Sequence, residues 1–185
     1  TYLHLLTDDV SGYSMGHVSS TDTAGDAIAA VQRWGQLFAY PKIITSDSGT
    51  PTANSSLWKE YRERVGFQHH LTTPYTPEAN GTAEAACKRV RTRLAALAAE
   101  LKVDGDEKVR RLLPHAVAVA NDVPSRRLGL DVTTGQYFTP RQAFIGFDPS
   151  TPLDLRVRAG ELVADPLPVE VRAGIVAGFR SDLDD

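Results

Sequence analysis

Short apolar strands alternate with longer amphipathic stretches along the first 121 residues, and this order most constrains the fold. Residues 2–7 and 13–19 read as a hairpin of two strands joined by the turn-forming stretch DDVSG. A helix follows over residues 22–40, where apolar side chains recur at three- and four-residue steps behind Thr21 or Asp22 as the N-cap. The pattern predicts an α/β domain, in which helices cover the faces of a sheet.

A second series of strand, helix and strand continues the domain. KIITSDSG predicts a short buried strand that ends at Asp47, and FQHHLTT predicts another strand. A helix over residues 54–65 separates these strands, and Gly66 ends it. The loop PYTPEANG then leads into a long helix over residues 82–102, which is followed by a further helix over residues 107–121.

The composition changes after residue 121. The remaining residues are rich in Gly, Pro and Asp and carry only short apolar runs, notably ELVAD and AGIVAGF. We therefore expect a core over residues 1–121, a linking segment over residues 122–150 and a small β-rich tail over residues 151–185. The chain opens inside an apolar segment without an initiator Met, which indicates a longer parent polypeptide.

The charge balance limits the partners that the chain can bind. Its formal net charge is −3 at pH 7 and its pI is near 5.9, so any contact with nucleic acid must be local. Cys87 is the only cysteine, which excludes an internal disulfide and a zinc cluster built from cysteines. No apolar run approaches the roughly eighteen residues of a membrane-spanning helix, so we expect no membrane partner.

Two carboxylates come at positions that suit a metal site. Asp47 ends a predicted strand, where open α/β sheets usually place their sites, and Glu84 lies in the first turn of a predicted helix. Such oxygens bind Mg²⁺, and a pair of ions about 4 Å apart can promote phosphodiester chemistry. Each residue also has an ordinary explanation, because Asp favours turns and Glu favours the positive end of a helix. The residues alone leave both interpretations open.

Basic residues cluster on the helix that begins near Glu84. Lys88 and Arg91 follow Glu84 at i+4 and i+7, so the three side chains share one helix face. Between residues 82 and 94, four basic residues accompany one acidic residue in a chain that is acidic overall. This asymmetry favours a local phosphate contact, although a basic helix face is more often simply solvated.

The motifs LLTDDVSGY, IITSDSGT and PYTPEANGTAE resemble, in order and spacing, the integrase catalytic core of retroviruses and retrotransposons, most closely the copia-like group. The resemblance covers about residues 2–121 and is most specific in GFQHHLTTPYTPEANGTAE. It implies a ribonuclease-H-like α/β fold with a mixed five-stranded sheet flanked by helices. It also implies 3′-end processing of element DNA and strand transfer into target DNA, with two Mg²⁺ or Mn²⁺ ions.

The resemblance further implies roles for particular residues and partners. Asp47 matches the second metal-binding aspartate of the family, and Glu84 matches its closing glutamate. The residues that match DNA-contacting positions of the family are Lys88, Arg91, Tyr75 and Asn80. The implied partners are element DNA ends, target DNA and further copies of the chain in a homo-oligomer. The implied location is the nucleus of a host cell, and a stage in a cytoplasmic particle is compatible with it.

The chain departs from the family pattern at several positions. The family has a third ligand, an Asp on a first strand that precedes the hairpin, so we expect that strand and ligand to be missing from these residues. Asp8 and Asp9 match the turn after the second strand instead, and we interpret Asp8 as a turn residue. Thr52 stands where the family usually has an aromatic residue, and Ala85 stands where it usually has Arg.

Three functions remain open on the sequence. The first is a polynucleotidyl transferase, the core of a retrotransposon integrase that is complete only with the upstream strand. The second is a binding module, in which the basic helix holds DNA without catalysis. The third is a degenerate or domesticated remnant of a polyprotein, whose surviving role is contact within an oligomer.

Overall fold

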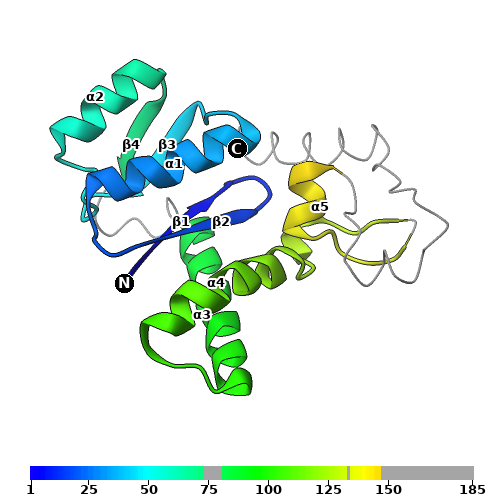
Figure 1. Cartoon of the computed structure of the whole chain (residues 1–185). Helices are drawn as coiled ribbons and strands as arrows, with labels where there is room; N and C mark the ends of the chain where they lie inside the picture. Colours follow the sequence, from blue (N-terminus) through cyan, green and yellow to red (C-terminus); the bar gives the residue numbers. More distant parts are fainter. Residues whose placement is uncertain (73–80, 133, 147–185) are drawn as a thin grey trace. The chain divides into compact units, whose positions relative to one another are not determined.

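A computed structural model describes residues 1–72, 81–132 and 134–146, which form two compact units (Figure 1). The first unit contains Thr1–Thr7 and Ser14–Ala120, and the second contains Asp8–Tyr13 and the described residues from Asn121 onward. The predicted tail over residues 151–185 lies outside the described residues, and the predicted domain boundaries stay predictions. None of the described helices has the length and apolar character that a membrane crossing requires.

The first unit is built around a β-hairpin that is covered on both faces. β1 (Tyr2–Thr7) pairs antiparallel with β2 (Ser14–Ser19), as the sequence predicts. Because successive side chains of a strand point to opposite faces, Leu3 and Leu5 pack against one hydrophobic cluster while Leu6 packs against another. The hairpin therefore lies between two layers of helices (Figure 1).

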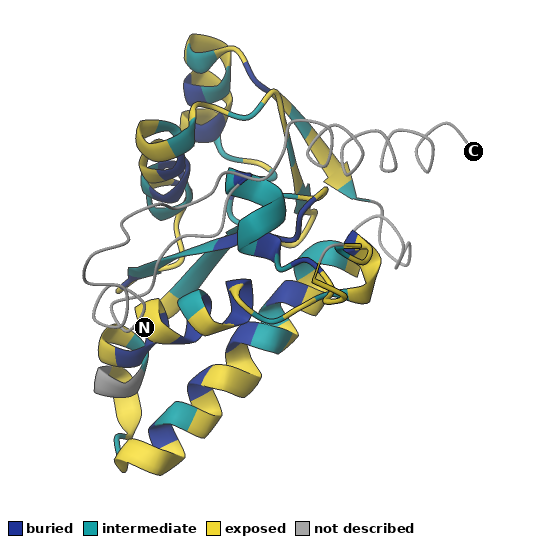
Figure 2. Ribbon diagram, turned by 90° about the vertical axis from the view of Figure 1, so that its right-hand side faces the viewer, coloured by how far each residue is buried: buried dark blue, intermediate teal, exposed yellow. Residues whose placement is uncertain are grey.

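Helices α3 (Gly81–Leu101) and α4 (Gly105–Asn121) cover one face of the hairpin. Their buried residues form stripes along the helices (Figure 2). This first cluster consists of Val90, Leu94, Ala98, Leu112, Leu113, Ala116, Val117 and Ala120. A Cβ atom at Gly16 of β2 would lie 3.1 Å from Leu113 Cδ2, so the glycine lets the strand backbone approach α4 closely.

Helices α1 (Ala24–Phe38) and α2 (Ser56–Val65) enclose the second cluster. This cluster consists of Ala24, Ile28, Val31, Trp58, Tyr61 and Phe67. Leu6 of β1 and Ile44 of β3 (Ile43–Asp47) both pack against it. The same pair of helices therefore supports the hairpin and the second sheet.

The start of α1 corrects the predicted N-cap. Thr23 caps the helix in place of Thr21 or Asp22, because Asp26 N donates to Thr23 Oγ1 at 3.3 Å and Thr23 N donates to Asp26 Oδ2 at 3.0 Å. This reciprocal capping box satisfies a backbone donor at each of its two positions. The hydrogen bonds from the Thr23 and Thr21 hydroxyls lower the pKa of Asp26.

The second sheet pairs β3 in parallel with β4 (Gln68–Thr72), and α2 forms the connection between them. The prediction that β3 is a buried strand is wrong, because Ile43 is 52% exposed and only Ile44 packs against the cluster. The described strands contain one antiparallel and one parallel pair, as a mixed sheet requires, and they form two sheets of two strands. The fifth strand that the resemblance implies is not among the described strands.

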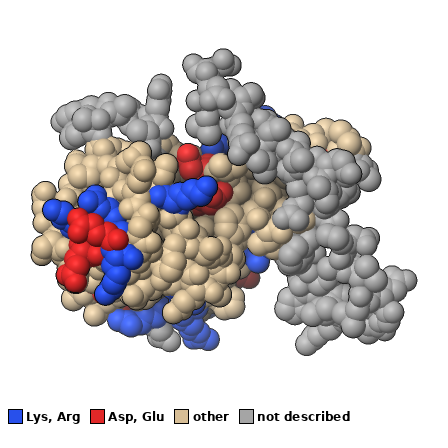
Figure 3. Space-filling model, turned by 90° about the horizontal axis from the view of Figure 1, so that it is seen from above, with Lys and Arg blue, Asp and Glu red and all other residues tan. Residues whose placement is uncertain are grey.

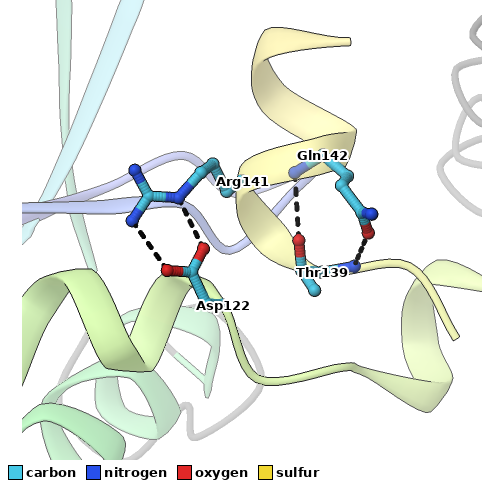
Figure 4. Close-up of polar contacts among 4 residues, drawn as sticks. All are labelled: Asp122, Thr139, Arg141 and Gln142. Atoms are coloured by element: carbon cyan, nitrogen blue, oxygen red, sulfur yellow. Dashed lines mark hydrogen bonds and ion pairs between the residues drawn. The ribbon is translucent and has the colours of Figure 1, made fainter. Parts of the chain in front are cut away.

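The second unit contains α5 (Pro140–Ile145), which begins with a capping box (Figure 4). Gln142 N donates to Thr139 Oγ1 at 3.1 Å, and Thr139 N donates to Gln142 Oε1 at 2.9 Å. The guanidinium of Arg141 forms two hydrogen bonds with the carboxylate of Asp122, one of them at 3.0 Å. Part of the predicted linking segment is therefore an ordered, locally capped structure.

The turn Asp8–Tyr13 also belongs to this second unit. Arg127 of the 3-10 helix η2 (Arg126–Leu128) donates to the Asp9 carbonyl at 2.7 Å. The rings of Tyr13 and Phe144 stack with their centroids 4.6 Å apart. One polar and one aromatic contact thus join the turn to the segment that follows α4.

The two clusters predict which leucines stabilise the fold. Leu113→Ala should lower the free energy of unfolding by about 2–5 kcal/mol, because Leu113 is 2% exposed and its loss leaves a cavity between α4 and the hairpin. Leu101→Ala, at a position 55% exposed, should change it by less than about 0.5 kcal/mol. Urea denaturation of the two variants and the parent chain measures both values. Equal losses would contradict the assignment of the core.

Candidate nucleic-acid and metal site

Asp47 is the last residue of β3 and lies opposite Thr72, the last residue of β4. Because parallel strands end at the same edge of a sheet, both residues lie at its carboxyl edge, where α/β folds place their sites. The Asp47 side chain is exposed, and its Oδ1 lies 3.4 Å from both Ser48 Oγ and Gly49 N. These contacts are long, and Oδ2 has no hydrogen-bond partner within the described part of the chain.

The loop after Asp47 is held by hydroxyl groups. Thr50 donates to the Asp47 carbonyl from both its backbone N, at 3.1 Å, and its Oγ1, at 2.7 Å. Thr52 is only 5% exposed, and its Oγ1 lies 2.8 Å from Thr50 Oγ1 and 3.3 Å from Ser46 Oγ. Thr52, where the resemblance leads us to expect an aromatic ring, thus provides a hydrogen-bonded hydroxyl.

Glu84 lies in the first turn of α3, as predicted. Its carboxylate is exposed, and no hydrogen bond or ion pair engages it within the described ranges. A carboxylate in the first turn is stabilised by the helix dipole. α3 starts at Gly81, and the predicted DNA-contacting residues Tyr75 and Asn80 lie in the preceding stretch, outside the described residues.

Lys88 and Arg91 are exposed on α3 together with Glu84, whereas Val90 and Leu94 are buried in the first cluster. Burial raises the pKa of the Cys87 thiol, the positive charge of Arg91 opposes this rise, and the negative charge of Glu84 adds to it. Glu84 and Arg91 therefore both act on one thiol, as a shared helix face requires.

Charged side chains of both signs accompany one another on the face shown in Figure 3 and along α2. α2, for example, carries three basic and two acidic residues, Lys59, Glu60, Arg62, Glu63 and Arg64. A basic contact with DNA would therefore be local, as the composition predicts.

Asp8 is a turn residue, as the sequence analysis interprets it. Its Oδ2 accepts hydrogen bonds from Ser11 N at 2.8 Å and from Ser11 Oγ at 2.7 Å. The same turn is closed by hydrogen bonds between Asp8 N and the Tyr13 carbonyl and between Gly12 N and the Asp8 carbonyl, both at 2.8 Å. The carboxylate is committed to this turn.

The donor atoms of Asp47 and Glu84 fit a hard cation. Both are exposed carboxylates, neither is taken up by an ion pair in the described ranges, and Mg²⁺ is held in such sites by one or two carboxylates plus water. No group of three or more His, Cys, Asp and Glu residues that could hold a metal occurs among the described residues. Asp47 ends β3, and Glu84 lies in the first turn of α3, the helix that follows β4 along the chain.

A polar network beside Asp47 was not identified from the sequence. It joins the side chains of Ser46, Thr50, Thr52, Trp58 and His69 by hydrogen bonds. Because neighbouring residues of a strand point to opposite faces, one of His69 and His70 is expected to be buried and the other exposed. His70 is exposed, whereas His69 is only partly buried. Its partner Ser46 follows only from the register of β3 and β4, which no local pattern reveals.

Comparison with known sequences finds retroviral polyproteins, whereas no family model matches the chain. The chain is 26% identical over 153 residues to the Pro-Pol polyprotein of simian foamy virus type 3 (strain LK3), covering 82% of the chain and 12% of that protein. It is 23% identical over 120 residues to the Gag-Pro-Pol polyprotein of Mason-Pfizer monkey virus, covering 65% of the chain and 7% of that protein. The chain thus spans about an eighth or less of these relatives.

Comparison with solved structures finds retroviral integrases. The catalytic core domain of BIV integrase aligns with a TM-score of 0.59 and 20% identity over 76% of the chain and 83% of that domain. The HTLV-2 integrase catalytic core domain in complex with magnesium, in a trimeric form, aligns with a TM-score of 0.57 and 18% identity over 76% and 82%. A chain of a simian T-cell lymphotropic virus intasome, in complex with PP2A regulatory subunit B56 gamma, aligns with a TM-score of 0.60 and 20% identity over 81% and 49%.

These findings confirm the resemblance seen in the motifs. The chain has the fold of the integrase catalytic cores named above and is similar in sequence to retroviral polyproteins. The relatives named above are retroviral, so the narrower likeness to the copia-like group stays a prediction. The roles carried over to single residues also stay predictions, namely those of Asp47, Glu84, Tyr75, Asn80, Lys88 and Arg91.

Cys87 offers a chemical test of the shared face on α3. Because burial raises its pKa, the thiol should react with iodoacetamide more slowly than free cysteine at pH 7. Arg91→Gln should slow the reaction further, and Glu84→Gln should speed it, each by less than about tenfold, since one pKa unit changes the thiolate fraction tenfold. Alkylation rates between pH 7 and about 10 measure these shifts. Shifts in the same direction would show that the two charges do not flank the thiol.

Proposed function

We propose that this chain is the catalytic core of an integrase, which processes the 3′ ends of element DNA and joins them to target DNA with the help of divalent cations. The observation that carries the proposal is the similarity to retroviral polyproteins and integrase cores over about four fifths of the chain, at 82% and 76% coverage. The exposed carboxylates of Asp47 and Glu84 and the basic face of α3 lie in the segments that carry the resemblance.

In this proposal Asp47 and Glu84 hold one or two Mg²⁺ or Mn²⁺ ions. When bound, such ions supply positive charge that polarises a phosphodiester and favours deprotonation of an attacking hydroxyl. Asp47 presents its carboxylate from the end of β3, and the following loop is tied to the Asp47 carbonyl through Thr50. Glu84 presents its carboxylate from the first turn of a long helix, whose buried stripe fixes the direction of the side chain. The two residues therefore stand on ordered supports, which the chemistry requires.

Lys88 and Arg91 would bind DNA phosphates beside the carboxylates. Because the chain has a net charge of −3, it offers DNA no overall attraction, and the local charge of α3 would decide where DNA lies. Tyr75 and Asn80, by resemblance, would contact DNA from the loop before α3. Basic groups one and two turns beyond Glu84 would then align the backbone with the reacting phosphate.

A second candidate function is DNA binding without catalysis. It is favoured by the finding that Asp8 is committed to its turn, so the described residues offer two exposed candidate ligands where the family uses three. Strand transfer distinguishes this module from the enzyme, whereas DNA binding is common to both.

Assembly and location are part of the proposal. The similar simian T-cell lymphotropic virus protein was solved in an intasome, and the similar HTLV-2 domain in a trimeric form. By analogy, we expect several copies of this chain to act together on DNA in the nucleus of a host cell.

DNA binding should depend on the basic face of α3. Lys88→Ala and Arg91→Ala should each weaken binding to a short duplex and reduce the slope of log K against log salt by about 1, because each removes one phosphate contact. Lys59→Ala, which removes an exposed basic residue of α2, should leave the slope unchanged. Fluorescence anisotropy at several salt concentrations measures these slopes. If all three substitutions weaken binding equally, DNA is held by the total charge of the protein, and the assignment of a DNA contact to α3 is wrong.

Strand transfer should depend on the two carboxylates. Asp47→Asn and Glu84→Gln should each reduce Mg²⁺-dependent strand transfer by more than about a hundredfold, since loss of an outer-shell partner alone costs 10–100-fold. Glu100→Gln, at the other end of α3, should retain activity. The assay uses labelled element ends with the chain and, in parallel, with the polypeptide of its parent reading frame. Activity that survives Glu84→Gln would refute the assignment, and the absence of all activity would favour the binding module.

A further inference from the structure

A chain of hydrogen bonds runs from the second cluster to Asp47. Trp58 Nε1 donates to His69 Nδ1 at 3.0 Å, so this nitrogen carries no proton. The imidazole is therefore neutral, with its proton on Nε2, and it donates to Ser46 Oγ at 2.8 Å. His69 of β4 thus connects a core residue of α2 with the residue that precedes Asp47.

The donor and the acceptor of each remaining hydrogen bond can be assigned because every hydroxyl has a single proton to donate. Thr50 Oγ1 donates its proton to the Asp47 carbonyl at 2.7 Å, so it must accept from Thr52 Oγ1 at 2.8 Å. Ser46 Oγ can then donate to Thr52 Oγ1 at 3.3 Å or to Thr50 Oγ1 at 3.2 Å. All donors point the same way, from the indole to the main-chain carbonyl of Asp47, and aligned hydrogen bonds strengthen one another.

The network is buried at Trp58, where it begins, and at Thr52, near its end. Trp58 is 3% exposed and Thr52 is 5% exposed, while His69 and Ser46 are half-buried. The rings of Trp58 and His69 also meet edge to face, with centroids 5.3 Å apart. Because a buried polar group without a partner is costly, loss of one link would disturb its neighbours.

We infer that His69 is a positioning residue: its neutral imidazole, through Ser46, Thr52 and Thr50, fixes Asp47 at the end of β3 and the loop that follows it. The second part of the inference rests on the proposed function, in which Asp47 binds a divalent cation. A fixed loop holds the carboxylate ready for the ion, so the cation need not order the loop when it binds. His69 itself does not touch the cation or DNA in this account.

A positioning role of His69 has other consequences than a purely structural role in the core. A structural role predicts that loss of the imidazole lowers stability and leaves the loop as it is. A positioning role predicts that the loop loosens and that cation affinity falls, and that hydroxyl deletions further along the chain of hydrogen bonds do the same. Substitutions at His69, Ser46 and Thr52 separate the two roles.

The variants are chosen to remove single links. His69→Phe keeps a ring against Trp58 and removes both hydrogen bonds of the imidazole. Thr52→Val keeps the shape of the side chain and removes its hydroxyl, and Ser46→Ala removes the central link. His70→Phe is the matched control, because it makes the same substitution at the exposed neighbour on β4.

The first measurement needs no cation. Amide hydrogen exchange of Thr50 and Ala53, whose N–H groups bond to the Asp47 and Thr50 carbonyls, reports the order of the loop. Exchange should accelerate about three- to tenfold in His69→Phe and Thr52→Val, as expected for the loss of one hydrogen bond, and should not change in His70→Phe. Unchanged exchange in both network variants would overturn the inference.

The second measurement is a titration with Mg²⁺ alone, followed by the amide resonances of Ser48 and Gly49. The dissociation constant should rise about three- to tenfold in His69→Phe, and adding Thr52→Val should change it little further, because both act on one network. If the variants loosen the loop but bind Mg²⁺ as the parent chain does, positioning is refuted. If the parent chain itself does not respond to Mg²⁺, the proposed metal function fails, while faster exchange in the variants still supports the ordered loop.

The network should also respond to pH through His69. Burial, followed by the charges of Arg62 on α2 and His70 on β4, lowers the pKa of His69 below its ordinary 6.5, and the groups that β3 and the loop place against it are uncharged hydroxyls. Protonation turns Nδ1 into a donor and breaks the bond from Trp58. Stability from neutral His69 is therefore complete above pH 6.5 and falls as the pH drops from there towards the lowered pKa. The Trp58 indole N–H resonance should titrate below pH 6.5, and a midpoint at or above 6.5 would contradict the neutral, buried imidazole.

Discussion

The parallel pairing of β3 with β4 is the constraint on which the site depends. Parallel strands require a connection that crosses over the sheet, and here α2 makes this connection and inserts Trp58 and Tyr61 into the second cluster. The packing of one helix thereby sets the register of two strands. That register brings Asp47 beside Thr72 at one edge, from which the chain continues towards α3. Without the pairing, the carboxylate of Asp47 would be only a turn residue at the end of an isolated strand.

The loop after Asp47 shows how polar contacts can replace an aromatic filler. An aromatic ring would stabilise the loop by nonpolar contacts, which tolerate small shifts of the loop backbone. The hydroxyl of Thr52 instead requires partners at hydrogen-bonding distance, and an unmade buried bond costs about 1–3 kcal/mol. A few geometries of the loop therefore satisfy the network, whereas many would satisfy an apolar contact. The Thr52 hydroxyl finds its partners in Ser46 and Thr50, and Ser46 in turn bonds to His69. No single position of the sequence reveals this network.

The sequence predicts those features that are determined locally. The hairpin, the helix that ends at Gly66 and the long α3 follow from turn residues and periodicity, and each is confirmed. The N-cap of α1 is missed because Thr21, Asp22 and Thr23 are all good caps, and only the return bond from Asp26 selects among them. The prediction that β3 is buried is wrong because burial depends on which strands and helices lie beside it. Asp47 and Glu84 come from motifs, whereas the link between His69 and Ser46 depends on a register set by tertiary packing.

The helical period of α3 determines both which of its residues enter the core and which form the proposed DNA face. Val90 and Leu94 must face the hairpin, which leaves Glu84, Lys88 and Arg91 together on the exposed side of α3. With a rise of about 1.5 Å per residue, Lys88 and Arg91 lie about 6 and 10.5 Å beyond Glu84 along the helix axis. A one-residue shift of the apolar stripe would rotate Glu84, Lys88 and Arg91 away from the exposed face of α3. The burial of the core therefore also sets the order of the charges that DNA would meet.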